Sequence, residues 1–167
     1  VCQGGYPEPN TRSAARARQW HRQYLNAIIQ RDVKDIAAIR DEDEMLALME
    51  MLAYRTGTLL NVSSMANELK MTRETTEKYL SILERLFLVR RLSAWHRNQS
   101  KRLVKTPKVH VIDSGLAATL SGLKTDDWNN HKSNFGPVLE SFVVQQLICQ
   151  ASWIGSDFKF SHYRDKD

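Results

Sequence analysis

Apolar residues return at three- and four-residue steps in the first part of the chain, which is the spacing of one face of an α-helix. Trp20, Tyr24 and Ile28 follow this spacing. A second helix is expected over residues 44–56, where the apolar positions again share one face. Gly57 comes directly after that stretch and is typical of a residue just past a helix end.

The middle of the chain predicts a different arrangement. A short helix is expected over residues 64–69, and a longer one, which Thr72 can cap, ends near residue 87. Two β-like stretches follow, residues 88–95 and 103–112, with a polar and basic segment between them. A helix, a short helix, a longer helix and a hairpin, in this order, indicate a winged helix-turn-helix.

Beyond Asp113 the pattern changes again. A short helix is expected over residues 114–121, followed by a polar loop. The Gly136-Pro137 pair favours a helix start, because proline suits the first helical turn, and the helix should run to about residue 150. A strand is expected over residues 158–163.

Composition narrows the class of protein. The 167 residues are 42% apolar and 26% charged, as in a folded domain or two small ones. Only two cysteines are present, which excludes a disulfide framework, and no apolar run is long enough for a membrane span. We therefore expect a reducing, cytoplasmic setting.

The positive charge is concentrated in one segment. The net charge is +5, yet residues 88–110 hold seven Lys or Arg and no acid, while the rest of the chain sums to −2. These cations can neutralise phosphates, and Trp95 can stack or wedge, so we expect the hairpin to bind nucleic acid, DNA first. An edge hairpin protected by charge, or one that docks an acidic partner, remains an alternative. The cations are Arg90, Arg91, Arg97, Lys101, Arg102, Lys105 and Lys108.

The third helix is a weaker candidate. Arg73 and Lys78 are expected on its outer face, where a groove-reading helix would contact DNA. The helix also carries as many acids as bases, so its net charge is zero, whereas phosphates favour a positive face. A solvated helix or a protein-contact surface fits this balance equally well.

Motifs for catalysis or cofactors are scarce. The sequence holds neither a phosphate-binding loop nor a dinucleotide fingerprint. The five histidines have no metal-ligand spacing, so each is expected to be a surface or half-buried residue. Glu140, Asp165 and Asp167 are too few and too loosely spaced to indicate a metal site by themselves.

The order of the segments resembles a family of predicted prokaryotic ATPases of the AAA superfamily whose C-terminal half is a DUF4143 region. Each matching piece is short, and together they follow one another over nearly the whole chain. The pieces are Gly4-Gly5-Tyr6-Pro7-Glu8, Trp20 with Tyr24, Arg31-Asp32-Val33, Leu52-Ala53-Tyr54-Arg55-Thr56-Gly57, Leu59-Leu60-Asn61, Tyr79-Leu80, Leu83-Glu84, Phe87-Leu88-Val89, Lys101-Arg102-Leu103-Val104-Lys105-Thr106-Pro107-Lys108, Asp113-Ser114-Gly115-Leu116, Gly136-Pro137, Leu139-Glu140, Phe142-Val143 and Tyr163-Arg164-Asp165-Lys166-Asp167.

This resemblance implies a mainly α fold with small β content, in three parts. Residues 1–42 would be the helical end of an ATPase domain, residues 43–113 a winged helix, and residues 114–167 the start of an α/β domain similar to PD-(D/E)xK restriction nucleases. The phosphate-binding loop would lie before Val1, and later nuclease-like acids after Asp167. This chain would then be catalytically silent.

Further expectations follow from the resemblance. The intact protein would be an ATPase that needs ATP and Mg²⁺. Arg31 could reach a neighbouring nucleotide, although a salt bridge with a nearby acid on the helix surface is the favoured role for it. Glu140 would be one acid, and one metal ligand, of the nuclease-like site. The partners would be DNA, the ATPase domain and a second copy of the chain, with no membrane. The chain would be a nucleic-acid-binding and regulatory module; the alternatives are part of a metal-dependent nuclease or a protein-interaction winged helix.

Overall fold

The structure is a computed structural model that describes residues 1–33, 42–95, 105–127, 132–155 and 158–163. It is mainly helical, with one two-stranded antiparallel sheet in the described ranges. Several expected features lie outside these ranges, among them the tip of the basic hairpin and the acids Asp165 and Asp167.

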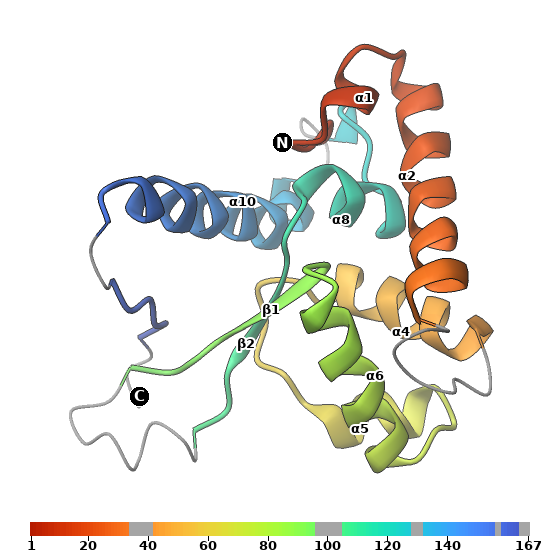
Figure 1. Ribbon diagram of the computed structural model, residues 1–167, viewed down its shortest axis with the longest axis vertical. Helices are drawn as coiled ribbons and strands as arrows, with labels where there is room; N and C mark the ends of the chain where they lie inside the picture. Colours follow the sequence, from red (N-terminus) through yellow and green to blue (C-terminus); the bar gives the residue numbers. More distant parts are fainter. Residues whose placement is uncertain (34–41, 96–104, 128–131, 156–157, 164–167) are drawn as a thin grey trace.

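The first helices of the chain lie together at one edge of the molecule. A single turn, α1 (Pro7–Asn10), precedes the long helix α2 (Ala14–Ile28), which continues into a π-helical turn, η1 (Ile29–Val33). Helix α2 packs against α8 (Ser114–Leu120), which approaches it from the side in Figure 1. The predicted first helix is therefore confirmed as far as the structure describes it.

Three helices and the hairpin form the centre of the fold. They are α4 (Glu42–Tyr54), α5 (Val62–Glu68) and α6 (Arg73–Arg85), followed by β1 (Val89–Leu92) and β2 (Lys108–Val111). The two strands pair in antiparallel register, with Val89 opposite Val111 and Leu92 opposite Lys108. The predicted helices are confirmed within two or three residues at each end.

One continuous core joins these elements. Leu48 and Leu52 of α4 are fully buried against Leu80 and Leu83 of α6. Leu116 brings α8 into the same cluster. The core thus spans from α2 to α10, and the hairpin leads from it to the surface (Figure 1).

Two sequence predictions for the second half need correction. Helix α10 spans Lys132–Trp153, so it begins before Gly136, and Pro137 lies inside it. Proline is tolerated there because only the N–H that would reach back to Ser133 is missing, near the helix start. The expected strand over residues 158–163 is a single bridge between Ala94 and His162, since no longer strand edge faces it in the part of the chain that is described.

Candidate nucleic-acid interface

Helix α6 is fixed at its start by local hydrogen bonds. The Thr72 hydroxyl accepts from the Thr75 backbone N–H at 3.0 Å and thus caps the helix. Asn61 caps the preceding helix α5 in the same way, through the Ser64 N–H at 3.0 Å. Lys70, in the left-handed region with a φ of 56°, turns the chain between the two helices. These caps orient α6 against the core.

The outer face of α6 carries its charges. Arg73, Glu74 and Lys78 are exposed, whereas Tyr79 and Leu83 are buried on the opposite face. Glu77 and Ser81 complete a shallow depression with the first three residues. The predicted exposure of Arg73 and Lys78 is therefore observed, and the two cations lie on one face.

Arg91 of β1 binds two of the acids of this helix. Its Nη1 atom lies 2.5 Å from Glu77 Oε1, and its Nε atom lies 3.0 Å from Glu84 Oε2. The Arg91 backbone N–H also donates to Glu84 Oε1 at 3.2 Å. Arg91 therefore lies against α6, and its charge is directed to carboxylates rather than to a phosphate.

This contact changes the charge balance of the α6 surface. Counted alone, the three acids of α6 cancel its three bases; with Arg91 added, the group sums to +1. In the described part of the chain, Glu74 is the acid of α6 for which no such pairing is found. Arg91 thus brings a positive charge to a helix that is neutral by itself.

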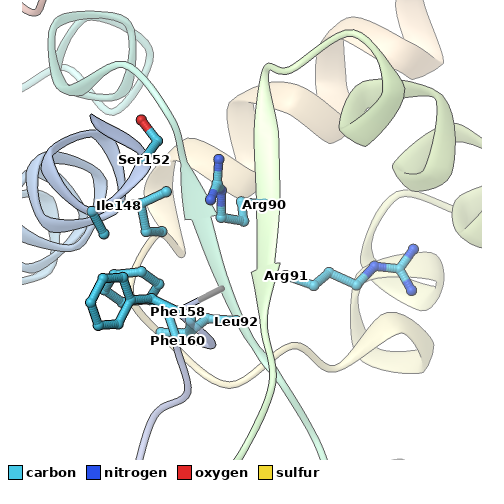
Figure 2. Close-up of a pocket in the computed structure, with 8 residues that line it drawn as sticks. Arg90, Arg91, Leu92, Ile148, Ser152, Phe158 and Phe160 are labelled. Carbon is cyan, nitrogen blue, oxygen red and sulfur yellow. The ribbon is translucent and has the colours of Figure 1, made fainter. Parts of the chain in front are cut away.

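Arg90 points the other way. Neighbouring residues of a strand face opposite sides, and Figure 2 shows Arg90 on the side of α10 while Arg91 extends toward α6. Arg90 lines a pocket with residues of α10 and of the segment after it. The structure therefore separates two arginines that the sequence grouped as one basic run.

Two other predicted residues lie farther along the hairpin. Trp95 is 45% exposed, its backbone N–H donates to the His162 carbonyl at 2.7 Å, and its ring centre lies 5.7 Å from that of Tyr163. Lys105 is exposed at the start of the returning chain. Arg97, Lys101 and Arg102 lie outside the described residues.

Lys108 and Glu140 form an ion pair between β2 and α10. Lys108 Nζ lies 2.6 Å from Glu140 Oε1. Within the ranges the structure describes, no group of three or more His, Cys, Asp or Glu is arranged to hold a metal. In this structure Glu140 is therefore one half of an ion pair that joins the hairpin to α10.

Next to this ion pair lies a buried polar network that the sequence did not reveal. His110 is 2% exposed, and its Nδ1 atom lies 2.9 Å from the Ser141 hydroxyl oxygen. That hydroxyl donates to the Pro137 carbonyl and lies 2.8 Å from the Thr56 hydroxyl, which accepts from the Val111 N–H. The Ser141 hydroxyl thus connects His110 of β2 with Pro137 of α10 and with Thr56.

The environment of His110 sets its protonation. Burial lowers the pKa of His110, Glu140 opposes this shift, and the charges of Lys108, His162 and Arg90 add to it. Its Nε2 atom has no hydrogen-bond partner in the described structure and faces Glu140 at 3.9 Å. The burial of His110 therefore favours the neutral form of its imidazole.

A second buried histidine lies near the start of the chain. His21 is fully buried, with Nδ1 3.0 Å from the Thr119 hydroxyl and Nε2 3.8 Å from Asp113. Burial lowers its pKa, and Asp113 partly opposes that shift. The expectation of surface or half-buried histidines is thus wrong for His21 and His110; His162 is half-buried as expected.

Asp113 also fixes the first residues of the chain. One of its carboxylate oxygens accepts from the Gly5 N–H and the other caps α8 through the Leu116 N–H, both at 2.7 Å. A Cβ on Gly115 would lie 2.5 Å from the Gln3 backbone, so only glycine permits this close approach. Two sequence features indicate this contact between the first residues and the start of α8: the Gly4-Gly5 pair and the Asp113-Ser114-Gly115 segment.

Arg31 is exposed in the π-helical turn η1. None of the described helices is long and apolar enough to cross a membrane.

Comparison with known proteins gives a family and a set of relatives. A family model described as "Domain of unknown function (DUF8612)" matches residues 1–127. Uncharacterized proteins of Mycobacterium bovis and Mycobacterium tuberculosis are each 29% identical over 145 residues, which is 86% of this chain and 33% of theirs. An uncharacterized protein of Haemophilus influenzae is 26% identical over 115 residues, or 66% of this chain and 29% of its own. The chain spans about a third of the length of these curated relatives.

These findings overturn the DUF4143 resemblance. The matching model is DUF8612, and the relatives are uncharacterized, so nothing in the comparisons supports the C-terminal half of an AAA ATPase. The short motifs that carried the resemblance are mostly apolar pairs and turn residues, which folding alone demands of many helical domains.

Proposed function

The chain belongs to the DUF8612 family of domains of unknown function, and we propose that it binds nucleic acid, DNA first, through α6 and the β1–β2 hairpin. The two capped helices α5 and α6, followed by the hairpin, have the element order of a winged helix-turn-helix. In this proposal α6 lies along the groove and the hairpin is the wing that follows the backbone.

The ion pairs of Arg91 carry the proposal. They hold Glu77 and Glu84 against the hairpin and leave Arg73 and Lys78 exposed on the outer face of α6. A helix that approaches phosphates gains when its own carboxylates are neutralised, because each unpaired acid would repel the backbone. The basic segment at residues 88–110 follows α6 in the sequence and adds further positive charge.

Contacts of this kind favour affinity over sequence choice. Lys and Arg side chains that reach phosphates position a protein on the duplex and carry little base information. The proposal therefore predicts binding that falls steeply with salt. The cytoplasmic setting inferred from the few cysteines belongs to the same proposal, since Cys2 and Cys149 are both free thiols.

A protein-interaction module is the second candidate. Leu139, Val143 and Leu147 follow one another at four-residue steps along α10, and all three are exposed. Such an apolar stripe on a helix is typical of a surface that contacts another protein. It lies on α10 and not on α6, so the two functions can be tested separately.

The deciding experiment is fluorescence anisotropy with a labelled 16-base-pair duplex across a salt series. The double variant Arg73→Ser/Lys78→Ser should bind the duplex more weakly. The fall of log K with log salt should also become shallower by roughly 1 to 2, at about 0.9 for each phosphate that the variant no longer neutralises. The matched control Arg16→Ser/Arg22→Ser removes the same charge from the exposed side of α2.

Equal slopes in the two variants would assign the binding to general positive charge and would count against α6. Absence of binding at low salt by a folded sample, verified by circular dichroism, would reject nucleic-acid binding and favour the protein-interaction candidate.

A further inference from the structure

A pocket of about 440 Å³ lies between the hairpin and the second half of α10 (Figure 2). Its walls come from β1, from α10 and from the segment that follows α10. Lining side chains that matter here are Arg90, Ile148, Ser152, Phe158 and Phe160. The volume lies in the range of sites that take a small organic ligand.

Two arginines line this pocket, and because the guanidinium of Arg91 is paired with Glu77 and Glu84 of α6, Arg90 is the one whose charge can serve a ligand. The Arg90 side chain lies on the α10 side of β1, and no ionic or hydrogen-bonding partner is found for it within the described ranges. The nearby Lys108, in contrast, is bound to Glu140. A guanidinium is always charged and binds carboxylate or phosphate through paired N–H groups, so the pocket offers a place for an anion.

The apolar component is aromatic. Phe158 is 55% exposed although it lines a concavity, and Phe160 is half-buried beside it. Exposed phenyl rings next to an arginine favour a flat, uncharged ring system that stacks on them, which removes apolar area from water. Ile148 of α10 adds a further apolar wall.

We propose that this pocket binds a nucleotide, with the base against Phe158 and Phe160 and the phosphate on Arg90. The Ser152 hydroxyl donates to the Cys149 carbonyl at 2.6 Å, so at the α10 side of the pocket its oxygen is placed to accept a hydrogen bond from an N–H group of the base. Stacking on aromatic rings is indifferent to base identity, because every base has a π-face. The inference deepens the proposed function: the nucleotide belongs to an unpaired strand next to a duplex held by α6.

An acidic peptide is the competing ligand for an arginine with apolar neighbours. The aromatic rings favour the nucleotide, since an aspartate or glutamate side chain would leave both phenyl rings exposed to water. A free mononucleotide has the same chemistry as a strand nucleotide, and the experiment has to separate these two sources.

The test measures the binding of three probes to the full chain: a labelled dT12 strand and a labelled blunt 12-base-pair duplex by anisotropy, and dTMP by calorimetry. The variant Phe158→Ala/Phe160→Ala should weaken dT12 binding by roughly 5- to 150-fold, because one stacked base contributes about 1–3 kcal/mol. Its duplex affinity should stay within about twofold.

Two further variants keep the test valid if the double variant folds poorly. Phe158→Leu preserves apolar bulk and removes the ring, so it should weaken dT12 binding while circular dichroism stays unchanged. Tyr54→Ala removes an aromatic ring of α4 that is even more exposed, at 78% against 55% for Phe158, and lies outside the pocket lining, so it should leave dT12 binding unchanged.

The outcomes separate the two proposals. Binding of dT12 that is insensitive to the phenylalanine variants overturns the pocket assignment, as does equal weakening of dT12 and duplex. Duplex binding without dT12 or dTMP binding leaves the proposed function intact and rejects the nucleotide pocket. If dTMP binds, Phe158→Leu weakens its binding, and dT12 does not bind, the pocket takes a free nucleotide rather than a strand. If none of the three probes binds, both proposals are rejected.

Discussion

The Nδ1 atom of His110 lies 2.9 Å from the hydroxyl oxygen of Ser141, so strand β2 and helix α10 share a hydrogen bond in the core. Through Ser141 the imidazole is connected to Pro137 and Thr56. The histidine thus belongs to the packing between the hairpin and α10, and its protonation affects stability.

Stability should fall as the pH drops below about 6.5. Burial lowers the pKa of His110 and of His21 in the folded state, so below their ordinary pKa the unfolded chain binds more protons and is favoured. Each histidine can contribute a slope of up to about 1.4 kcal/mol per pH unit. Urea unfolding between pH 7.5 and 6.0, above the range of carboxylate titration, measures it; His110→Gln should reduce the slope, and an unchanged slope would contradict the assignment.

The charges around His110 should tune its pKa in opposite directions. Lys108→Met removes a cation that lowers this pKa and leaves Glu140 free to attract a proton on Nε2, so the pKa should rise. Glu140→Gln should lower it. Titration of the imidazole Hε1 signal by NMR measures both shifts, and a change of the same sign in the two variants would disprove the pairing.

Gly57 should tolerate a side chain less well than Gly122. Both glycines have φ near +75°, so alanine is strained equally at either position. At Gly57 the added Cβ would also lie 3.0 Å from the Pro137 carbonyl oxygen, whereas it meets nothing within 4 Å at Gly122. We expect Gly122→Ala to cost about 1 kcal/mol and Gly57→Ala roughly 1–2 kcal/mol more, as measured by urea unfolding.

Arg91→Gln should lower the affinity for the duplex, while the free energy of unfolding should change only slightly. The ion pairs with Glu77 and Glu84 are partly exposed, so their loss should cost roughly 1 kcal/mol or less of stability. Two carboxylates would then face the DNA unneutralised. Arg12→Gln is the matched control, since Arg12 pairs with Glu8 and the same charge is lost away from α6. Equal anisotropy curves for the two variants would argue against a role for the Arg91 contact.

The basic hairpin should add phosphate contacts of its own. Changing Arg97, Lys101, Arg102 and Lys105 to Ser should lower the slope of log K against log salt by about 0.9 for each phosphate that these side chains neutralise in the unmodified chain. Fluorescence anisotropy with the same duplex measures it. A slope equal to that of the unmodified chain would place the DNA contact on α6 alone.

Much of the helical frame could be predicted from local signals. Thr72 marks the start of α6, and Gly57 marks the turn that follows α4, because capping and left-handed backbone depend on neighbouring residues only. The start of α10 was predicted too late, because the Gly136-Pro137 pair is typical of a helix start. The four residues before Gly136 are also helical, although they carry no such start signal. The strands are shorter than predicted, since pairing needs a partner edge and not only β-favouring residues.

The candidate site was less accessible to sequence reasoning. The sequence shows that the basic residues are clustered. It does not show that Arg90 and Arg91 point in opposite directions or that Arg91 pairs with Glu77, because both depend on how β1 packs on α6. The burial of His21 and His110 depends on partners about 98 and 31 residues away, Thr119 and Ser141, which no local pattern indicates.

The pairing of β1 with β2 aligns Arg90 with His110 and Arg91 with Val109. A slip of one residue between the strands would exchange the two arginines, since side chains alternate along a strand. The guanidinium that neutralises α6 would then enter the pocket, and the one in the pocket would replace it, while Val89, which shares the α6 side of β1 with Arg91, would leave the core. The burial of Val89 therefore also keeps the two arginines on separate sides of β1, with Arg91 toward α6 and Arg90 toward the pocket.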